Sequence, residues 1–483
     1  METSTAPSSS RKTLVDAETR KKPMTVDLLK DWQYVERSIH RILAGWGRHI
    51  AGWDDKSALH RHIWEQSEVV RRLRARIGEF PGGKPDAPVS VGLEDLVNTV
   101  LLAPSLEDAL DGVHFLLGKA LVGAYVEYAT SAHPVHDAPT IAMLHEINQI
   151  KAGQWLWFRD YRRRRPHSTD PVYAEKVRGL IADLGGFAAP LPPTKPGARP
   201  VGVGTEFTLP KFSARDLPTK PKHEFMPYVR ADFTTNLEAR RLFWAYVYML
   251  EKNLPDDQLS WLYYGHYMPW DWHADVSRHL WDESRHGDSG YSRLKDFGID
   301  PAEVGFPSYN NDEQAKALDA IATGRKTTDF ADYVDDLADI PAEPMTPKDL
   351  YEAVFFIGMV AENGHFVVKN EAYKDFQDGK DMESAEMMLF DVIDETTHVQ
   401  YAHRWLPLLA EHAGISAEGY RERAAKVRAE YERGEQEKIA ALNLSRDPAD
   451  PAYAFYQDLL ARIRRVAPLE NAATCPERSP KPM

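Results

Sequence analysis

Two Glu-x-x-His motifs, each preceded at a distance by one more glutamate, constrain the fold of this chain more than any other feature. The six residues are Glu283 and His286, Glu395 and His398, and the upstream Glu251 and Glu362. Residues three apart in a helix project from one face, so each motif presents a carboxylate and an imidazole to a common point. The upstream glutamates lie 32 and 33 residues before their motifs. Two helical hairpins of similar length would produce this spacing, which predicts a four-helix bundle.

Four carboxylates and two imidazoles would meet inside such a bundle. Buried carboxylates are costly unless they are paired or bound to a cation, so the pattern predicts metal ions. Oxygen and imidazole ligands without a thiolate suit iron or manganese better than a structural zinc. We therefore expect these six side chains to be the catalytic ligands of two Fe ions, with Mn or a mixed Mn/Fe pair as the alternative. Surface Glu/His pairs with solvated charge would leave the matched spacing unexplained.

The composition excludes several other kinds of site. A single cysteine, Cys475, excludes an intrachain disulfide, a Cys-based zinc site and an iron–sulfur cluster, and it favours a reducing cytoplasm. The formal charge of −14 opposes nucleic acid as a partner, because such binding neutralises phosphates with cations. The basic run at 162–165 fits a solvated helix end, with an anionic ligand as the alternative.

Hydropathy predicts no membrane partner. By this measure no stretch approaches the apolar length that spans a bilayer, and residues 1–23 lack the apolar core of a signal peptide. We therefore expect a cytoplasmic protein.

Helical periodicity dominates the chain and strand-like alternation is scarce, which predicts an all-α fold. Long helical segments are expected at 26–50, 56–79, 105–132, 139–165, 232–267, 272–295, 348–377, 382–412 and 417–442. The expected domains are a disordered tail (1–23), an N-terminal helical bundle without metal ligands (24–187), a Pro-rich linker (188–227), the di-metal bundle (228–445), and a C-terminal helix with a disordered tail (446–483).

The two halves match each other, which indicates an internal duplication. At an offset of 217 residues, six of fifteen positions are identical: Trp53/Trp270, Asp54/Asp271, Arg61/Arg278, His62/His279, Trp64/Trp281 and Ser67/Ser284. A weaker match at an offset of 245 pairs Met143-Leu144 with Met388-Leu389.

In this alignment the N-terminal half has lost its metal ligands. Gln66 stands for Glu283 and Gly153 for His398, so we expect a metal-free bundle that shapes the substrate approach or acts as a built-in dimer partner. An out-of-register alternative is a second metal site built from Glu36, Glu68, Glu127 and Glu146.

The sequences Asp282-Glu283-Ser284-Arg285-His286 and Asp394-Glu395-Thr396-Thr397-His398 resemble the Asp-Glu-x-x-His motifs of ferritin-like di-iron oxygenases, including the hydroxylase components of bacterial multicomponent monooxygenases. The resemblance covers residues 232–412 and implies a ferritin-like four-helix bundle. It also implies that Asp282 and Asp394 hydrogen-bond ligand histidines, with Arg285 in the same network. The subfamily stays open, because Phe366, Gly290 and Asp391 replace a threonine, a radical tyrosine and a histidine that different subfamilies carry.

Several neighbouring residues bear on the site. His365 and Asp391 are candidate additional metal ligands, although a core histidine bonded to the backbone is the alternative for His365. His279 is assigned to structure, because its counterpart His62 persists in the half without ligands. Pro255 is expected to kink or end the first helix just after Glu251, and an ending would weaken that ligand.

The expected function is a non-haem di-iron oxidase or oxygenase that activates O2 to hydroxylate, N-oxygenate or desaturate a small organic substrate. No dinucleotide or flavin motif is present in the sequence, so an external electron donor or reductase, or the substrate itself, must supply electrons. The alternatives are a ferroxidase or rubrerythrin-like peroxide scavenger, and a non-enzymatic helical scaffold. A channel near Met359, His365 and Phe366 would bound the substrate class, and a homodimer is left open.

Overall fold

The protein is all-helical, as the periodicity predicts. The computed structural model describes residues 22–210, 213–217, 225–305, 344–441 and 444–469, and these residues form helices and connecting loops without a strand. The expected tails at 1–21 and 470–483 lie outside the described residues, as does Cys475.

The chain divides into two compact units. Unit 1 comprises residues 1–46 and 61–207, and unit 2 comprises residues 47–60 and 208–483. The division falls inside one helix and inside the predicted linker rather than at the ends of that linker. Each unit is described separately below.

Unit 1 is built from helices that follow the predicted segments closely. They are α1 (Lys22–Gly47), α2 (Trp53–Gly78), α3 (Val91–Leu101), α4 (Leu106–Leu110), η3 (Asp111–Leu117), α5 (Gly118–Ser131), α6 (Ala138–Arg164), α7 (Pro171–Asp183) and η4 (Gly185–Phe187). The short α3 and α7 were not expected. The Trp32 ring packs edge-on against Tyr125 and Tyr128 in the core, with ring centroids 4.8 and 5.7 Å apart.

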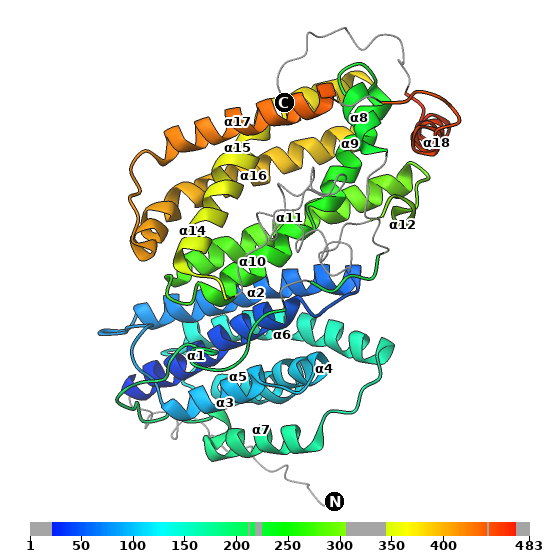
Figure 1. The fold of residues 1–483 in the computed structure, drawn as a ribbon. Helices are drawn as coiled ribbons and strands as arrows, with labels where there is room; N and C mark the ends of the chain where they lie inside the picture. The colour runs from blue at the N-terminus through cyan, green and yellow to red at the C-terminus, as the bar shows by residue number, and fades with distance from the viewer. Residues whose placement is uncertain (1–21, 211–212, 218–224, 306–343, 442–443, 470–483) are drawn as a thin grey trace, which may run out of the picture. The chain divides into compact units, whose positions relative to one another are not determined.

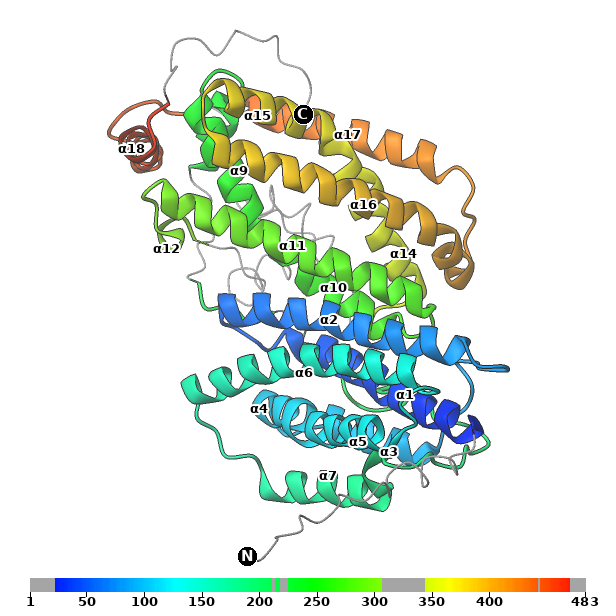
Figure 2. The same ribbon diagram turned by 180° about the vertical axis from the view of Figure 1, so that it is seen from behind.

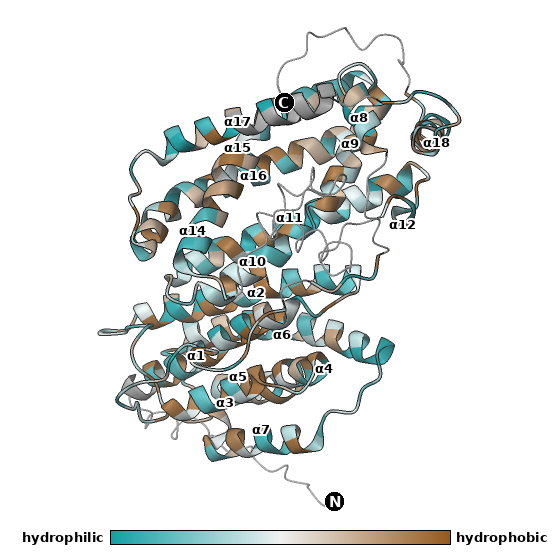
Figure 3. Cartoon of the chain, viewed as in Figure 1, coloured by the Kyte–Doolittle hydropathy of each residue, from teal (hydrophilic) through white to brown (hydrophobic). Residues whose placement is uncertain are grey.

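One segment of unit 1 shows that the prediction of no bilayer-length apolar stretch was wrong. The continuous helical stretch Leu106–Ser131 is long and apolar enough, by length and composition alone, to span a bilayer. Figure 3 shows its hydrophobic residues gathered along α4 and α5. Within its most apolar window 61% is buried inside the protein, as expected for a core helix.

Unit 2 contains a bundle in which α11 and α16 lie side by side (Figures 1 and 2). Its helices are α8 (Met226–Asp232), α9 (Leu237–Leu250), α10 (Asn253–Tyr264), α11 (Trp270–Asp296), α12 (Pro301–Val304), α14 (Pro347–Phe355), η6 (Phe356–Glu362), α15 (Asn363–Asp378), α16 (Met382–Ala413), α17 (Tyr420–Ala441) and α18 (Pro451–Val466). Helix α9 packs on α11, and α14 and α15 pack on α16. Helices α9, α11, α14, α15 and α16 therefore pack against one another in unit 2.

The first helix of this bundle is broken near Pro255. Helix α9 ends at Leu250, α10 begins at Asn253, and Glu251 caps α9 with helical backbone angles. Proline has no amide hydrogen to donate to the carbonyl of Glu251, which is consistent with a break one turn earlier. The Glu251 carbonyl instead accepts from the amide of Leu254 at 3.0 Å.

Among the described residues, each unit contains one seven-residue π-helical segment, η3 in unit 1 and η6 in unit 2. Such segments fit one more residue per turn than an α-helix and occur often at functional sites. The segment η6 ends on Glu362, so the wider turn sets the direction in which this side chain leaves the helix. The Met359 carbonyl within η6 accepts a hydrogen bond from Arg428 of α17 at 2.9 Å.

The described part of the Pro-rich connector contributes to packing rather than lying free. It forms no long helix, but Val201 and Leu209 are buried. Arg199 closes it onto unit 1, since its amide and guanidinium bind Glu94 at 2.7 and 2.8 Å.

The close approach of α9 to α11 gives a stability prediction. A Cβ at Gly290 would lie 2.2 Å from the Met249 nitrogen and 2.6 Å from the Ala245 oxygen, and backbone atoms cannot give way as a flexible side chain can. We expect Gly290→Ala to destabilise unit 2 by about 1–3 kcal/mol, as overpacking does. Urea denaturation followed by circular dichroism measures the change.

A matched control is Gly153→Ala in α6, where an added Cβ meets nothing within 4 Å. This change should stabilise its helix slightly, by about 0.5–1 kcal/mol, through helix propensity. Equal denaturation midpoints for Gly290→Ala and wild type would contradict the steric argument.

Candidate metal centre

The structure brings all six predicted ligands together inside unit 2. Glu251 comes from the end of α9, and Glu362 comes from the end of η6. Helix α11 supplies Glu283 and His286, and α16 supplies Glu395 and His398. All are buried except Glu251, whose side chain is 20% exposed. Glu251 therefore reaches the centre even though its helix ends there.

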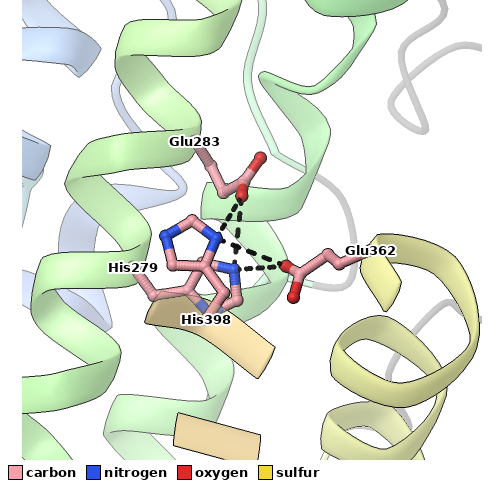
Figure 4. Close-up of side chains that lie close together, drawn as sticks. All are labelled: His279, Glu283, Glu362 and His398. Atoms are coloured by element: carbon pink, nitrogen blue, oxygen red, sulfur yellow. Dashed lines mark ion pairs between the residues drawn. The ribbon is translucent and has the colours of Figure 1, made fainter. Parts of the chain in front are cut away.

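One half of the centre is formed by two carboxylates and two imidazoles (Figure 4). His279 Nε2 lies 2.7 Å from Glu362 Oε1 and 3.3 Å from Glu283 Oε1. His398 Nδ1 lies 3.2 Å from the same Glu283 oxygen and 3.6 Å from Glu362 Oε1. Four ligand atoms thus face a common point.

The other half is centred on His286. Its Nδ1 lies 3.4 Å from Glu251 Oε2, 3.5 Å from Glu283 Oε2 and 3.4 Å from Asp391 Oδ1. Glu395 joins His286 and Asp391 in a group whose ligand atoms are close enough to share an ion. Glu283 therefore turns one oxygen to each half, as a carboxylate that bridges two ions does.

Buried atoms that face one another within the centre indicate that this donor set suits metal ions. Apart from the contacts between carboxylates and imidazoles given above, these atoms make no hydrogen bond in the structure. They include Glu251 Oε2, Glu283 Oε1, His286 Nδ1, both Glu362 oxygens, Glu395 Oε2, His398 Nδ1 and His279 Nε2. Buried polar atoms are normally satisfied, so a concentration of exceptions needs an explanation, and a coordinated cation supplies one.

The electrostatics of the centre also favour cations. Burial alone would lower the pKa of His286, but the charges of Glu283 and Asp391 outweigh burial and hold this pKa well above its usual range. Burial raises the pKa of Glu251 to about 8, although Lys369 acts in the opposite direction. Carboxylates in this interior thus retain protons or gather positive charge when no metal compensates them.

The aspartates of the two motifs support the histidines crosswise. Asp394 Oδ2 lies 3.2 Å from His286 Nε2, and Asp282 Oδ2 lies 3.4 Å from His398 Nε2. Each aspartate therefore contacts the histidine of the other motif, leaving Nδ1 to face the centre. Arg285 joins the pair, because its Nη2 binds Asp394 at 2.7 Å and also binds Asp282. Such contacts fix the ring orientation and the tautomer of a ligand histidine.

Two residues join the centre that the sequence analysis did not place there. His279, which we assigned to structure, contributes to the first half. Its position one turn before Glu283 was the available signal, and the surviving His62 weighed against it. Lys369 of α15 was not anticipated, and its Nζ lies 2.7 Å from Asp391 Oδ2 and 2.8 Å from Glu395 Oε1.

The candidate ligands His365 and Asp391 have different environments. Asp391 is buried and faces His286. His365 is exposed on α15 and belongs to none of the groups of described residues that could share an ion.

In unit 1, hydrogen bonds satisfy the carboxylate that the out-of-register alternative assigns to a metal. Glu36 is fully buried and accepts a hydrogen bond from the Tyr125 hydroxyl at 2.7 Å. Lys151 Nζ pairs with Glu36 and donates to Gln66 Oε1 at 2.8 Å. Lysine, tyrosine and amide groups thus take the role that a cation would have beside Glu36. Elsewhere in unit 1, Asp108, Asp111 and His167 have ligand atoms close enough to share an ion.

Two hollows border the centre in unit 2. The larger has a volume of about 360 Å³, reaches His286 and Asp391, and opens between exposed residues such as Ser289 and Glu386. Met359, His365 and Phe366 do not line it. The smaller, of about 20 Å³, adjoins His279 and His398 and is walled mainly by apolar and aromatic side chains. A space of that size holds about one molecule as small as water.

Comparison with known proteins does not identify a family. No protein-family model matches the chain, and no curated protein and no solved structure matches it either. The chemistry of the site therefore rests on its own residues.

The crosswise support gives a prediction for metal binding. We expect Asp394→Asn to weaken binding of Mn(II) by about 10–100-fold, because the neutral amide no longer holds His286 in its ligand tautomer. Equilibrium dialysis against Mn(II) measures the affinity. Asp271→Asn is a suitable control, because Asp271 is an exposed residue in the first turn of α11 and lines neither hollow. Equal affinities for Asp394→Asn and wild type would show that Asp394 does not position the ligand.

Proposed function

We propose that this protein is a ferritin-like di-metal oxidoreductase that uses dioxygen to oxidise a small organic substrate. The observation that carries the proposal is the position of Glu283, whose two oxygens face two separate ligand groups at distances of 3.2–3.5 Å. A carboxylate placed in this way serves two ions at once. Neither a surface Glu/His pair nor a single-ion site requires it.

The ligands divide between two positions. Position A would be held by His279, Glu283, Glu362 and His398, and position B by Glu251, Glu283, His286, Asp391 and Glu395. Imidazole and carboxylate donors without a thiolate suit iron or manganese. When bound, a pair of such ions supplies the electrons that reduce dioxygen.

The protein groups around the ions bind, orient and exclude water. Asp282 and Asp394 hold the ligand imidazoles, and Arg285 binds both aspartates and keeps them in place. Burial of the ligands keeps bulk water from competing for the same atoms. The apolar hollow beside His279 and His398 suits a small uncharged molecule such as dioxygen.

The larger hollow is the feature that favours an organic molecule as the substrate. It brings a molecule directly to His286 and Asp391, and Met387 and Phe390 give it an apolar wall. Ser289, Ser292, Arg285 and Arg293 also line it, and their hydroxyl and guanidinium groups would orient a polar substrate. The sequence contains no flavin or dinucleotide motif and one cysteine, so electrons would come from a separate reductase or from the substrate.

We also infer that the two units arose by duplication. Trp53 begins α2 and Trp270 begins α11, at the offset of 217 residues. The two π-helical segments have equal length and begin at Asp111 and Phe356, at the offset of 245 residues. Two backbone features thus coincide with two sequence offsets. Unit 1 would then be a copy in which protein hydrogen bonds replaced the metals.

Ferroxidase activity is a second candidate, which the rim of the larger hollow favours. Asp296, Glu383 and Glu386 are exposed there and would attract ferrous ions. In that case iron is the substrate and the centre turns over with ferrous ion alone.

Oxygen uptake separates the two functions. Protein saturated with Fe(II) should bind about two ions per chain, and on mixing with dioxygen it should complete one turnover and stop. Glu283→Ala should abolish both results, because one residue serves both positions. The exposed Glu411→Ala on the same bundle should leave them unchanged. Uptake that continues as excess Fe(II) is added would favour the ferroxidase and overturn the oxygenase.

A further inference from the structure

Lys369 places an ammonium group in one half of the candidate metal centre. Its side chain extends from α15 and is 2% exposed. The Nζ atom lies 3.0 and 2.7 Å from the two oxygens of Asp391 and 2.8 Å from Glu395 Oε1. The Tyr248 ring centroid lies 5.6 Å away on another side. The ammonium group is therefore held among position B ligands.

The two positions differ in which protein groups neutralise the negative charge of their carboxylates. In position A, Glu362 contacts the imidazoles of His279 and His398, and no lysine or arginine among the described residues pairs with it. In position B, Asp391 and Glu395 already share an ammonium ion. A dication that enters position B would meet a like charge a few ångströms away, and like charges repel strongly in a buried site.

The charge of the whole centre accounts for the lysine. Five carboxylates contribute to the two positions, namely Glu251, Glu283, Glu362, Asp391 and Glu395. Two dications would neutralise four of the five negative charges, and Lys369 would neutralise the fifth. Lysine and both ions are therefore compatible, but the second ion gains less than the first because the lysine has already compensated part of position B.

Unit 1 also contains a buried lysine that pairs with a buried carboxylate. Lys151 pairs with the buried Glu36 and also binds Gln66. A lysine of this chain thus occupies the interior of a helical bundle in partnership with a carboxylate.

We propose that Lys369 makes the two metal positions unequal, so that position A binds a divalent ion tightly and position B binds the second ion at least ten-fold more weakly. This inference rests on the proposed di-metal function and adds an order of loading to it. The centre would thus pass through a singly loaded state, which lets two different metals be loaded in sequence.

Titration with Mn(II) under anaerobic conditions tests the order of loading without any enzymatic turnover. Electron paramagnetic resonance should show the six-line signal of an isolated Mn(II) ion up to one equivalent per chain. The broad signal of a spin-coupled pair should appear only as the second equivalent binds. Free Mn(II) measured in the same samples gives the two dissociation constants.

Variants of the lysine supply the causal test. Lys369→Met keeps the aliphatic length and removes the charge, so we expect its second dissociation constant to fall at least ten-fold towards the first. Lys369→Arg keeps the charge and should keep two separate steps. The matched control is Lys151→Met, which removes a buried, carboxylate-paired lysine from unit 1 and should leave both constants unchanged.

Several outcomes would overturn the inference. In wild type, a coupled signal from the first addition or two equal dissociation constants would do so. A Lys369→Met protein that folds, as circular dichroism reports, but keeps the wild-type gap would also do so. Should that variant not fold, the wild-type titration decides alone. Absence of Mn(II) binding in wild type would instead overturn the di-metal function itself.

Discussion

Buried negative charge is the constraint on which the rest of unit 2 depends. Five carboxylates converge between α9, α11, η6 and α16, where they contact imidazoles and one lysine. Such an interior is unfavourable unless cations enter it, because charged groups lose their hydration on burial. If ions bind there as proposed, the bundle would gain much of its order from them, and their removal would loosen the helices that supply the ligands.

The surroundings of the centre keep the ligands in place before any ion arrives. Arg285 ties together the aspartates of both motifs, and each aspartate contacts the histidine of the opposite motif. Helices α11 and α16 are thereby linked on the far side of the ligand imidazoles. The absence of a side chain at Gly290 lets α9 approach α11, which carries Glu251 towards Glu283. Preorganisation of this kind makes a site selective for geometry as well as for charge.

Local periodicity was sufficient to predict the long helices and the meeting of the six side chains, because a shared face three or four residues apart depends on helix geometry alone. Lys369 could not be predicted, since it reaches Asp391 and Glu395 across helices. The environment of His279 and the path of the larger hollow depend on how far each helix is rotated about its own axis. The π-helical turn before Glu362 changes the rotation of its helix, and no sequence pattern predicted this turn. The linker prediction failed to include Val201 and Leu209 in the packing because proline content reports backbone shape rather than burial.

The two units show two solutions to one problem. In unit 1 a buried carboxylate meets Lys151, Tyr125 and Gln66, and its charge is satisfied without a metal. In unit 2 one lysine meets two of five carboxylates, which leaves three that only imidazoles face. If both bundles share an ancestor, gain or loss of metal binding requires only a change in the ratio of buried cations to buried anions. Lys369 then makes position B intermediate between a metal-binding interior and a metal-free one. More of its buried negative charge is neutralised by protein cations than in position A, and less than in the interior of unit 1.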